Sequence, residues 1–363
     1  MATVMIALLA SLWLADRAIG LVHGPVVRPV NQLGMEGAPN EVGTLLRPGF
    51  TGAYATMEYS TRVRVNSLGL RGGETALRKP DGTFRILALG DSFTFGQGVE
   101  EWQTWPSVLQ ERASAANGHL DVINGGFTGL SPSGYLRYLR VRGLQLDPDL
   151  VIVQVFVGND VVDELLDEDA SLTGAERIAF ESHYLAGLPL AAVGRSREQG
   201  PLGAVRRTVD DLVPNLYDLV TLSVVKTQYM LGAHRMQFDY ILAEETPDLE
   251  HGWQRLLAAL EATVRLAEGD GRRAIAIVIP FYDQVAPSSI QAGLERDRPQ
   301  RRIMAFCGAQ RLTCIDLLPA LRAAGDPREL YYLQDGHLTP RGQETVAIAV
   351  LDRLKREGLI PGK

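Results

Sequence analysis

The sequence predicts an α/β fold, in which a parallel sheet of five strands carries helices on both faces. Three observations support this prediction. Short apolar runs alternate with longer segments of helical pattern from residue 84 onward. Residues 150–157 form a continuous apolar run, which is typical of a strand that is covered on both faces. The first three runs each end near polar residues flanked by glycine, as expected at the carboxyl edge of a parallel sheet.

The five strands are expected where the apolar runs lie, at residues 84–89, 120–124, 150–157, 274–280 and 313–317. The first of these runs stops at Gly90-Asp91-Ser92, and Gly90 permits the tight turn that follows a buried strand. Ser92 is therefore expected at the mouth of the sheet, with its own backbone N–H pointing the same way.

Helices are expected between and after the strands. We place them at residues 104–116, from residue 131, at 252–267, at 298–309 and from 339 to about 357. Their starts are marked by Thr104 with Pro106 in the first turn, by Ser131-Pro132 and by Thr339-Pro340.

Two segments depart from this alternation. Residues 23–79 are rich in Gly, Pro and Asn, and we expect a small β-rich preface with short strands at 51–65 and a turn at 66–72. Residues 161–250 mix acidic, Gly/Pro-rich and helical pieces, of which 216–231 is the clearest helix. We interpret this second segment as a long insertion beside the site, within a main domain at residues 80–363.

The N-terminal segment, residues 1–22, is predicted to be a membrane anchor. Residues 2–15 are apolar apart from Thr3 and Ser11, and Asp16 and Arg17 follow them. As a helix this run would span about 21 Å, against about 30 Å of hydrocarbon, so a core helix of a soluble protein is the alternative. An anchor would hold the main domain at the membrane and outside the cytoplasm; a cytoplasmic location is the alternative. No Lys or Arg precedes the run to set its orientation.

The composition restricts the partners of the protein. Of 363 residues, 46% are hydrophobic and 22% are charged, with a net charge of -7, which argues against a nucleic-acid partner. The two cysteines, Cys307 and Cys314, are too few for a zinc site. We expect two buried thiols, and a single disulfide is the alternative if the domain is exported.

Polar residues at the strand ends predict a catalytic site. Ser92 follows the first strand, Gly129 follows the second near Asn124, Asn159 follows the third, and Asp335-Gly336-His337 stands before the last helix. In a doubly wound sheet these loops share one edge. Ser92 can act as nucleophile, His337 as its base and Asp335 as the group that orients the imidazole. The N–H groups of Ser92 and Gly129 and the Asn159 amide can hold the oxyanion, and glycine at 129 lets the reacting oxygen approach the backbone.

These motifs resemble the four blocks of the SGNH (GDSL-like) hydrolase family, in the family's order. The matching residues are Gly90-Asp91-Ser92, Gly129, Gly158-Asn159-Asp160 and Asp335-x-His337, and the resemblance covers residues 84–357. It implies a three-layer flavodoxin-like fold and ester hydrolysis through an acyl-serine, with no cofactor and no metal ion. The expected function is that of an esterase, a lipase-like enzyme or a carbohydrate deacetylase, with a small ester or an acylated glycan as substrate.

One departure from the family pattern keeps two alternatives open. The usual spacing is Asp-x-x-His, whereas Gln334 stands three residues before His337. The Asp-x-His spacing resembles acyltransferase-like members of the superfamily, so an O-acyltransferase of envelope polysaccharide is one alternative. An inactive envelope scaffold is the other, because the family that the motifs resemble includes degenerate members. In extended chain, side chains two apart share a face, so Asp335 and His337 are expected to point into the cleft together, with Gln334 on the other side.

Other functions have weaker support in the sequence. Gly96-Gln97-Gly98 does not extend to the G-x-G-x-x-G of a nucleotide site. Asp-x-His is also found in metallophosphoesterases, but there it comes first, and here it comes last. The remaining histidines match no motif and are interpreted as surface or structural residues: His23, His119, His183, His234 and His251.

Overall fold

The computed structural model describes residues 10–18, 35, 42–43, 45–55, 58–117, 120–168, 247–286, 295–333 and 335–361. The chain forms two compact units, one of residues 1–28 and 171–239 and one of residues 29–170 and 240–363. The expected helix at 216–231 and most of the predicted insertion lie outside the described residues, as do Gln334, His23, His119, His183 and His234.

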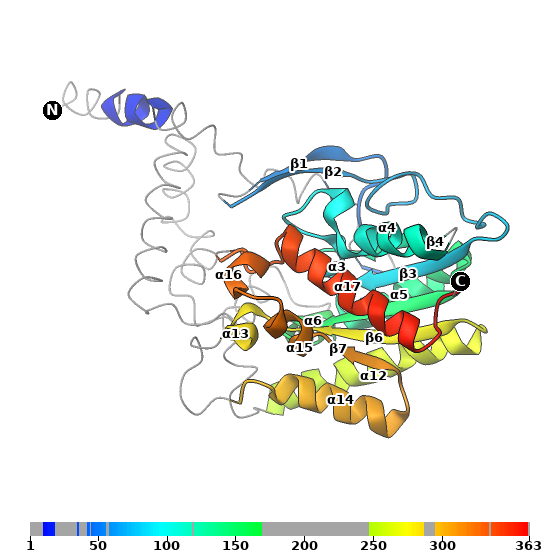
Figure 1. Cartoon of the computed structure of the whole chain (residues 1–363). Coiled ribbons are helices and arrows are strands. Elements are labelled where there is room, and N and C mark those ends of the chain that lie inside the picture. The colour runs from blue at the N-terminus through cyan, green and yellow to red at the C-terminus, as the bar shows by residue number, and fades with distance from the viewer. Residues whose placement is uncertain are drawn as a thin grey trace. The chain divides into compact units, whose positions relative to one another are not determined.

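The second unit is built on a five-stranded parallel sheet, which confirms the predicted fold class (Figure 1). The strands are β3 (Phe84–Gly90), β4 (Leu120–Gly126), β5 (Leu150–Phe156), β6 (Arg273–Ile279) and β7 (Cys314–Asp316). Their order in the sheet is β4-β3-β5-β6-β7, which is the flavodoxin-like order. The chain leaves β3 toward β4 on one side and returns to β5 on the other. Ligand sites in such sheets lie at this reversal, outside the carboxyl ends of the strands.

Helices cover both faces of the sheet because the crossovers are right-handed and the strand order reverses once. One layer contains α4 (Trp105–Asn117) and α17 (Pro340–Arg356), which pack on each other. The other contains α5 (Pro132–Val141) and α12 (Pro247–Gly269), which also pack on each other (Figure 1). The predicted helix starts are confirmed: the Ser131 hydroxyl accepts the Gly134 N–H at 3.1 Å, and the Thr339 hydroxyl accepts the Gly342 N–H at 3.3 Å.

Several short helices were not predicted. After β3 comes α3 (Ser92–Phe95), and η1 (Glu101–Gln103) and η2 (Gly143–Leu146) are single 3-10 turns. The longest of these unpredicted helices, α6 (Asp160–Glu168), lies at the start of the segment interpreted as an insertion. Asp160 and Asp163 lie in its first turn, where the positive end of the helix dipole stabilises acidic side chains. Other short helices follow β6 and β7: α13 (Tyr282–Val285), α15 (Leu318–Ala323) and α16 (Pro327–Leu330). The helix between β6 and β7, α14 (Arg298–Gln310), is one that the sequence predicts.

The predicted β-rich segment is an antiparallel hairpin. Strand β1 (Thr51–Ala55) pairs with β2 (Ser60–Arg64), and a bridge between Val65 and Arg71 closes the predicted turn. Within the turn, Asn66 Oδ1 accepts the N–H groups of Leu68 and Leu70 at 2.9 and 3.0 Å. The Asn66 side chain therefore stabilises the turn together with the backbone bonds from the Asn66 N–H to the Leu70 carbonyl and from the Gly69 N–H to the Asn66 carbonyl.

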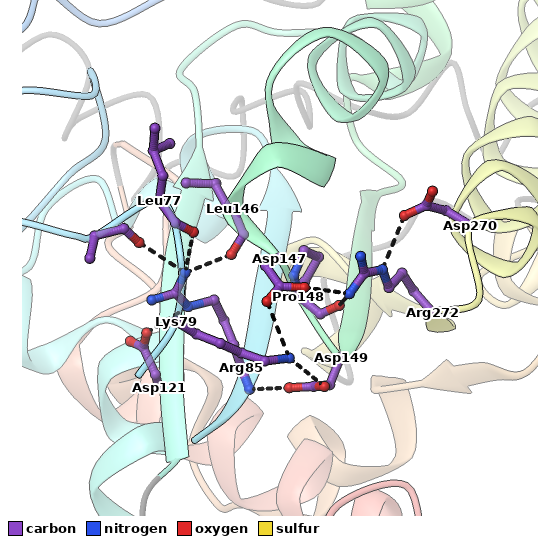
Figure 2. Close-up of polar contacts among 11 residues, drawn as sticks. Leu77, Lys79, Arg85, Asp121, Leu146, Asp147, Pro148, Asp149, Asp270 and Arg272 are labelled. Carbon is purple, nitrogen blue, oxygen red and sulfur yellow. Dashed lines mark hydrogen bonds and ion pairs between the residues drawn. The ribbon is translucent and has the colours of Figure 1, made fainter. Parts of the chain in front are cut away.

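Charged side chains tie together the amino ends of the strands, opposite the edge that carries the motifs (Figure 2). Arg85 at the start of β3 is 1% exposed, and its Nε donates to Asp121 of β4 at 2.8 Å. Asp149, just before β5, accepts the Arg85 backbone N–H at 2.7 Å and Lys79 Nζ at 2.6 Å. The Arg85 Nη1 donates to three carbonyl groups, those of Ala76, Leu77 and Leu146.

Arg85→Met is expected to lower the free energy of unfolding by about 3 kcal/mol, because three carbonyls and Asp121 lose a shared donor. Urea unfolding followed by circular dichroism measures the loss. Arg301→Met is the control, since its ion pair with Glu295 is exposed and such pairs contribute at most about 1 kcal/mol. Equal losses in the two variants would contradict this role for Arg85.

The two cysteines form a disulfide, so the prediction of two buried thiols is wrong. Cys307 lies on α14 and Cys314 begins β7, with their Cα atoms 6.2 Å apart. The chain reverses between them at Arg311, which adopts a left-handed conformation with φ of 56°, and the Leu312 N–H donates to the Cys307 carbonyl at 2.8 Å. This reversal brings two thiols seven residues apart within bonding distance.

Residues 10–18 of the predicted N-terminal anchor are helical. Within the part of the chain that the structure describes, no helix is long and apolar enough to cross a membrane.

Candidate active site

The predicted nucleophile lies at the tip of β3, as the first residue of α3. Asp91 caps this helix, because its Oδ1 accepts the Phe93 N–H at 2.8 Å. The turn is so tight that a Cβ on Gly90 would lie 2.2 Å from Gln154 Oε1, and one on Gly126 would lie 2.0 Å from the Phe95 nitrogen. Glycine at both strand ends is therefore what lets α3 pack directly on the sheet.

The structure brings Ser92, His337 and Asp335 into one hydrogen-bonded chain. His337 Nε2 lies 2.7 Å from Ser92 Oγ, and His337 Nδ1 lies 2.5 Å from Asp335 Oδ1. All three side chains are buried or nearly so, and the imidazole also lies against the Phe93 ring, with centroids 4.9 Å apart. This arrangement can remove the hydroxyl proton from a serine and hold the resulting imidazolium.

A tight loop, rather than extended chain, places the acid and the base. An antiparallel bridge joins Tyr331 to Leu338, and the Tyr332 N–H donates to the His337 carbonyl at 2.8 Å. Between them the chain turns at Gly336, whose φ of 81° favours glycine. The expectation that alternation along an extended chain aligns Asp335 and His337 is therefore wrong, because this turn aligns them.

The electrostatics of the pair favour the ion pair between imidazolium and carboxylate. Burial acts to lower the pKa of His337, but the charge and hydrogen bonds of Asp335 outweigh it and raise that pKa above 6.5. Burial acts to raise the pKa of Asp335, but the charge and hydrogen bond of His337 and further hydrogen bonds from Tyr59 and Gln97 lower it. Asp335 therefore stays ionised wherever His337 titrates.

Two buried carboxyl groups, those of Asp91 and Asp160, lie near the hydrogen-bonded chain of Ser92, His337 and Asp335. Burial raises the pKa of Asp91 to about 6, and its charge favours the imidazolium of His337. Burial and the neighbouring charge of Asp91 raise the pKa of Asp160 well above its ordinary range. Asp160 Oδ2 accepts the Phe156 N–H at 2.8 Å, which fixes the end of β5 where Asn159 stands.

These shifts predict that activity rises with pH. A base must be neutral to accept the serine proton, so kcat/KM should fall as pH drops through the raised pKa of His337, with a midpoint above 6.5. The pH profile of ester hydrolysis between about pH 5 and 9 measures it, with the Ser92→Ala protein as background. A midpoint at or below 6.5 would contradict the ion pair with Asp335.

The predicted oxyanion donors follow β3, β4 and β5 at the same edge of the sheet. Ser92 N–H belongs to the first turn of α3, where no helical acceptor exists. Gly129 is exposed, in a turn closed by the Leu130 N–H on the Phe127 carbonyl at 3.1 Å. The Asn159 carbonyl accepts the Val162 and Asp163 N–H groups, which fixes this residue at the start of α6.

Asn124, which the sequence places near this group, has a different environment. Its Oδ1 accepts the Gly126 N–H at 3.0 Å, and its Nδ2 lies 3.4 Å from the Phe95 carbonyl. It therefore braces β4 against α3.

Asn159→Ala is expected to lower kcat by about 10²–10³ with little change in KM, as loss of one preorganised oxyanion donor does. Steady-state kinetics on a short p-nitrophenyl ester separates the two parameters. A loss confined to KM would mean that Asn159 binds the substrate without stabilising the transition state.

Three polar residues near Asp335 carry no signal in the sequence. Tyr59 OH donates to Asp335 Oδ2 at 2.9 Å, Glu58 Oε2 accepts the Asp335 N–H at 2.8 Å, and Gln97 Nε2 lies 3.4 Å from Asp335 Oδ2. Gln97 belongs to the loop Gly96-Gln97-Gly98, whose pattern does not match a nucleotide site and indicates no contact with the acid. Among the described residues, no group of His, Cys, Asp or Glu side chains is placed to hold a metal ion.

Comparisons with known proteins agree with the motifs. The family model of the GDSL-like lipase/acylhydrolase family matches residues 88–345. No curated protein matches the chain. A lipase/acylhydrolase structure from Enterococcus faecalis is 15% identical, covering 76% of this chain and 96% of its own, with a TM-score of 0.40. A psychrotrophic esterase from Pseudoalteromonas is 14% identical, covering 76% and 99%, with a TM-score of 0.39.

A third structure, a member of the lipolytic G-D-S-L family from Veillonella parvula, is 12% identical and covers 75% of this chain and 99% of its own, with a TM-score of 0.38. The family model spans well over half of the 363 residues and includes the predicted nucleophile, oxyanion donors, acid and base. The chain belongs to the GDSL-like lipase/acylhydrolase family.

Proposed function

We propose that the protein is a serine-dependent hydrolase of ester bonds that works through an acyl-serine intermediate. The observation that carries this proposal is the continuous chain from Ser92 Oγ through His337 to Asp335, with distances of 2.7 and 2.5 Å. Membership of a family of lipases and acylhydrolases supports the same chemistry.

The reaction follows from this geometry. His337 Nε2 takes the hydroxyl proton as Ser92 Oγ attacks the ester carbonyl, and Asp335 stabilises the imidazolium that forms. The Ser92 and Gly129 N–H groups and the Asn159 amide hold the oxyanion. His337 then gives its proton to the leaving alcohol. Water attacks the acyl-serine by the same route in reverse, which releases the acid and restores Ser92.

Labelling of Ser92 tests whether the site is reactive. An alkyl phosphonate probe should modify Ser92 alone, as peptide mass spectrometry would show, and the His337→Ala protein should label far more slowly. A protein that is folded but unlabelled would favour the inactive scaffold instead.

An O-acyltransferase of cell-envelope polysaccharide is the second candidate. The Asp-x-His spacing supports it, and the Cys307–Cys314 disulfide supports a location outside the cytoplasm, because disulfides persist in oxidising compartments. We therefore propose that the domain faces the envelope, held at the membrane by residues 1–22. Water and a sugar hydroxyl can attack the same acyl-serine.

Incubation with an acetyl donor, with and without oligosaccharide, separates the two reactions. Acetate release that is independent of the sugar supports hydrolysis. Acetylated sugar, formed at the expense of acetate, supports transfer.

A further inference from the structure

We propose that Tyr59, in the β hairpin that precedes the sheet, is a positioning residue for the catalytic carboxylate. This inference rests on the proposed function. Tyr59 lies outside the region that the family model matches, residues 88–345, so membership of the family does not assign it. The hairpin would then be a part of the catalytic machinery.

The two carboxylate oxygens of Asp335 accept hydrogen bonds from different residues. Oδ1 accepts from His337 Nδ1 at 2.5 Å, and Oδ2 accepts from Tyr59 OH at 2.9 Å. Because the carboxylate is largely buried, with 15% of its side chain exposed, Oδ2 depends on protein donors. With both oxygens held, the carboxylate plane is fixed and Oδ1 stays aimed at the imidazole.

The same hairpin also holds the backbone of the acid. Glu58 Oε2 accepts the Asp335 N–H at 2.8 Å, so two consecutive residues of the hairpin contact one residue of the catalytic loop. That loop turns at Gly336, where the chain has the most conformational freedom. Glu58 contacts the backbone of Asp335 and Tyr59 contacts its side chain, so the hairpin restricts the conformation of the loop from outside it.

Tyr59 is itself held in place. The residue is 8% exposed, and its ring lies 4.8 Å from the Tyr332 ring. Both rings pack so closely on Gly98 that a Cβ there would overlap them. Tyr332 OH donates to the Gly98 carbonyl at 2.9 Å. The donor to Asp335 is therefore rigid, which is what a positioning group needs.

Arg71 fixes the hairpin to the segment that carries the nucleophile. Its Nη1 donates to the Phe95 and Gly96 carbonyls at 2.6 Å, and its Nη2 donates to the Val99 carbonyl at 2.5 Å. The guanidinium is buried and lies over the Phe95 ring, 4.5 Å from its centroid. Ser92 and Tyr59 are thus attached to the same short stretch of chain, on either side of the base.

Removal of the Tyr59 hydroxyl has a predictable electrostatic signature. The hydrogen bond lowers the pKa of Asp335, so without it the carboxylate becomes more basic and holds the His337 imidazolium more firmly. The pKa of His337 should then rise. Three other groups that face this pair keep their contacts in this variant: Asp91, Glu58 and Tyr332. Gln97 keeps its contact with Asp335 Oδ2 but loses the Tyr59 hydroxyl as an acceptor.

The test compares Tyr59→Phe with the parent protein and with Ser67→Ala. Ser67→Ala removes another hydroxyl of the same segment, one that donates to Glu74 on the surface at 2.5 Å. We expect Tyr59→Phe to lower kcat about tenfold to a hundredfold with KM nearly unchanged, within the range known for groups that orient others. The acid limb of the pH profile of kcat/KM should move to higher pH. Ser67→Ala should alter none of these values.

A titration of the His337 imidazole by NMR makes the outcome independent of turnover. If the pKa of His337 rises in Tyr59→Phe but the parent protein shows no turnover that depends on Ser92, the proposed function is wrong and the positioning role stands. If the parent is active and Tyr59→Phe keeps both its kcat and its His337 pKa, the positioning role is overturned. A loss of kcat without a change in that pKa also overturns it, because Tyr59 would then only support the fold.

Discussion

Ser92→Ala is expected to lower kcat on a short p-nitrophenyl ester by about 10⁵–10⁶, as loss of the nucleophile does in other serine hydrolases. The bond that forms in the first step joins Ser92 Oγ to the acyl carbon, and alanine has no atom to form it. The variant should stay folded, because the Oγ contacts only His337 among the hydrogen bonds seen in the described residues. Its melting temperature should therefore match that of the parent.

Ser107→Ala serves as the control for this experiment. Ser107 is on α4, where its hydroxyl pairs with Thr104, and its loss should leave kcat unchanged. Turnover by Ser92→Ala at the parent rate would mean that another group attacks the ester. The acyl-serine mechanism would then be wrong, whereas the fold would be unaffected.

The sheet could be predicted because each strand carries its own local signal. The continuous apolar run of β5 and the caps at Ser131 and Thr339 depend only on neighbours in the chain. The strand ends then placed Ser92 and Asn159 at one edge, and the start of the last helix placed His337 there, because parallel strands have one common carboxyl edge. The order of the segments and their hydrophobic period were sufficient to predict these features.

The remaining features depend on contacts between distant residues. Tyr59 meets Asp335 across 276 positions, and no period or motif in the sequence relates the two. The disulfide needed the reversal at Arg311, a non-glycine residue in a conformation that favours glycine, so the local sequence predicted two separate thiols. The turn at Gly336 was missed for a similar reason: two-residue spacing fits extended chain equally well.

Asp335→Asn is the second prediction with a large effect, and we expect kcat to fall by about 10⁴. The Oδ1 atom lies 2.5 Å from His337 Nδ1, so the carboxylate fixes the tautomer in which Nε2 faces Ser92 unprotonated. An asparagine amide at this place can present a donor to Nδ1, which favours the opposite tautomer. Steady-state kinetics on the alkaline side of the acid limb of the parent's pH profile measures the loss, because His337 acts as a base only in its neutral form.

The pH profile gives this variant a second signature. Because the charge of Asp335 raises the pKa of His337, its removal leaves burial as the dominant influence, and the pKa should fall below that of the parent. The acid limb of the pH profile of kcat/KM should therefore move to lower pH, opposite to the shift expected for Tyr59→Phe. Gln334→Ala, one position earlier, removes a neutral side chain that cannot stabilise an imidazolium, and it should change kcat little.

Opposite shifts in these two variants would identify Asp335 as the charge that acts on His337 and Tyr59 as the group that restrains that charge. Near-normal activity in Asp335→Asn would instead leave a dyad of Ser92 and His337. Glu58 of the hairpin is another carboxylate near this loop, but it accepts the Asp335 backbone N–H. Asp91 also acts on His337, but its Oδ1 accepts the Phe93 N–H as the cap of α3, so we expect neither carboxyl group to replace Asp335.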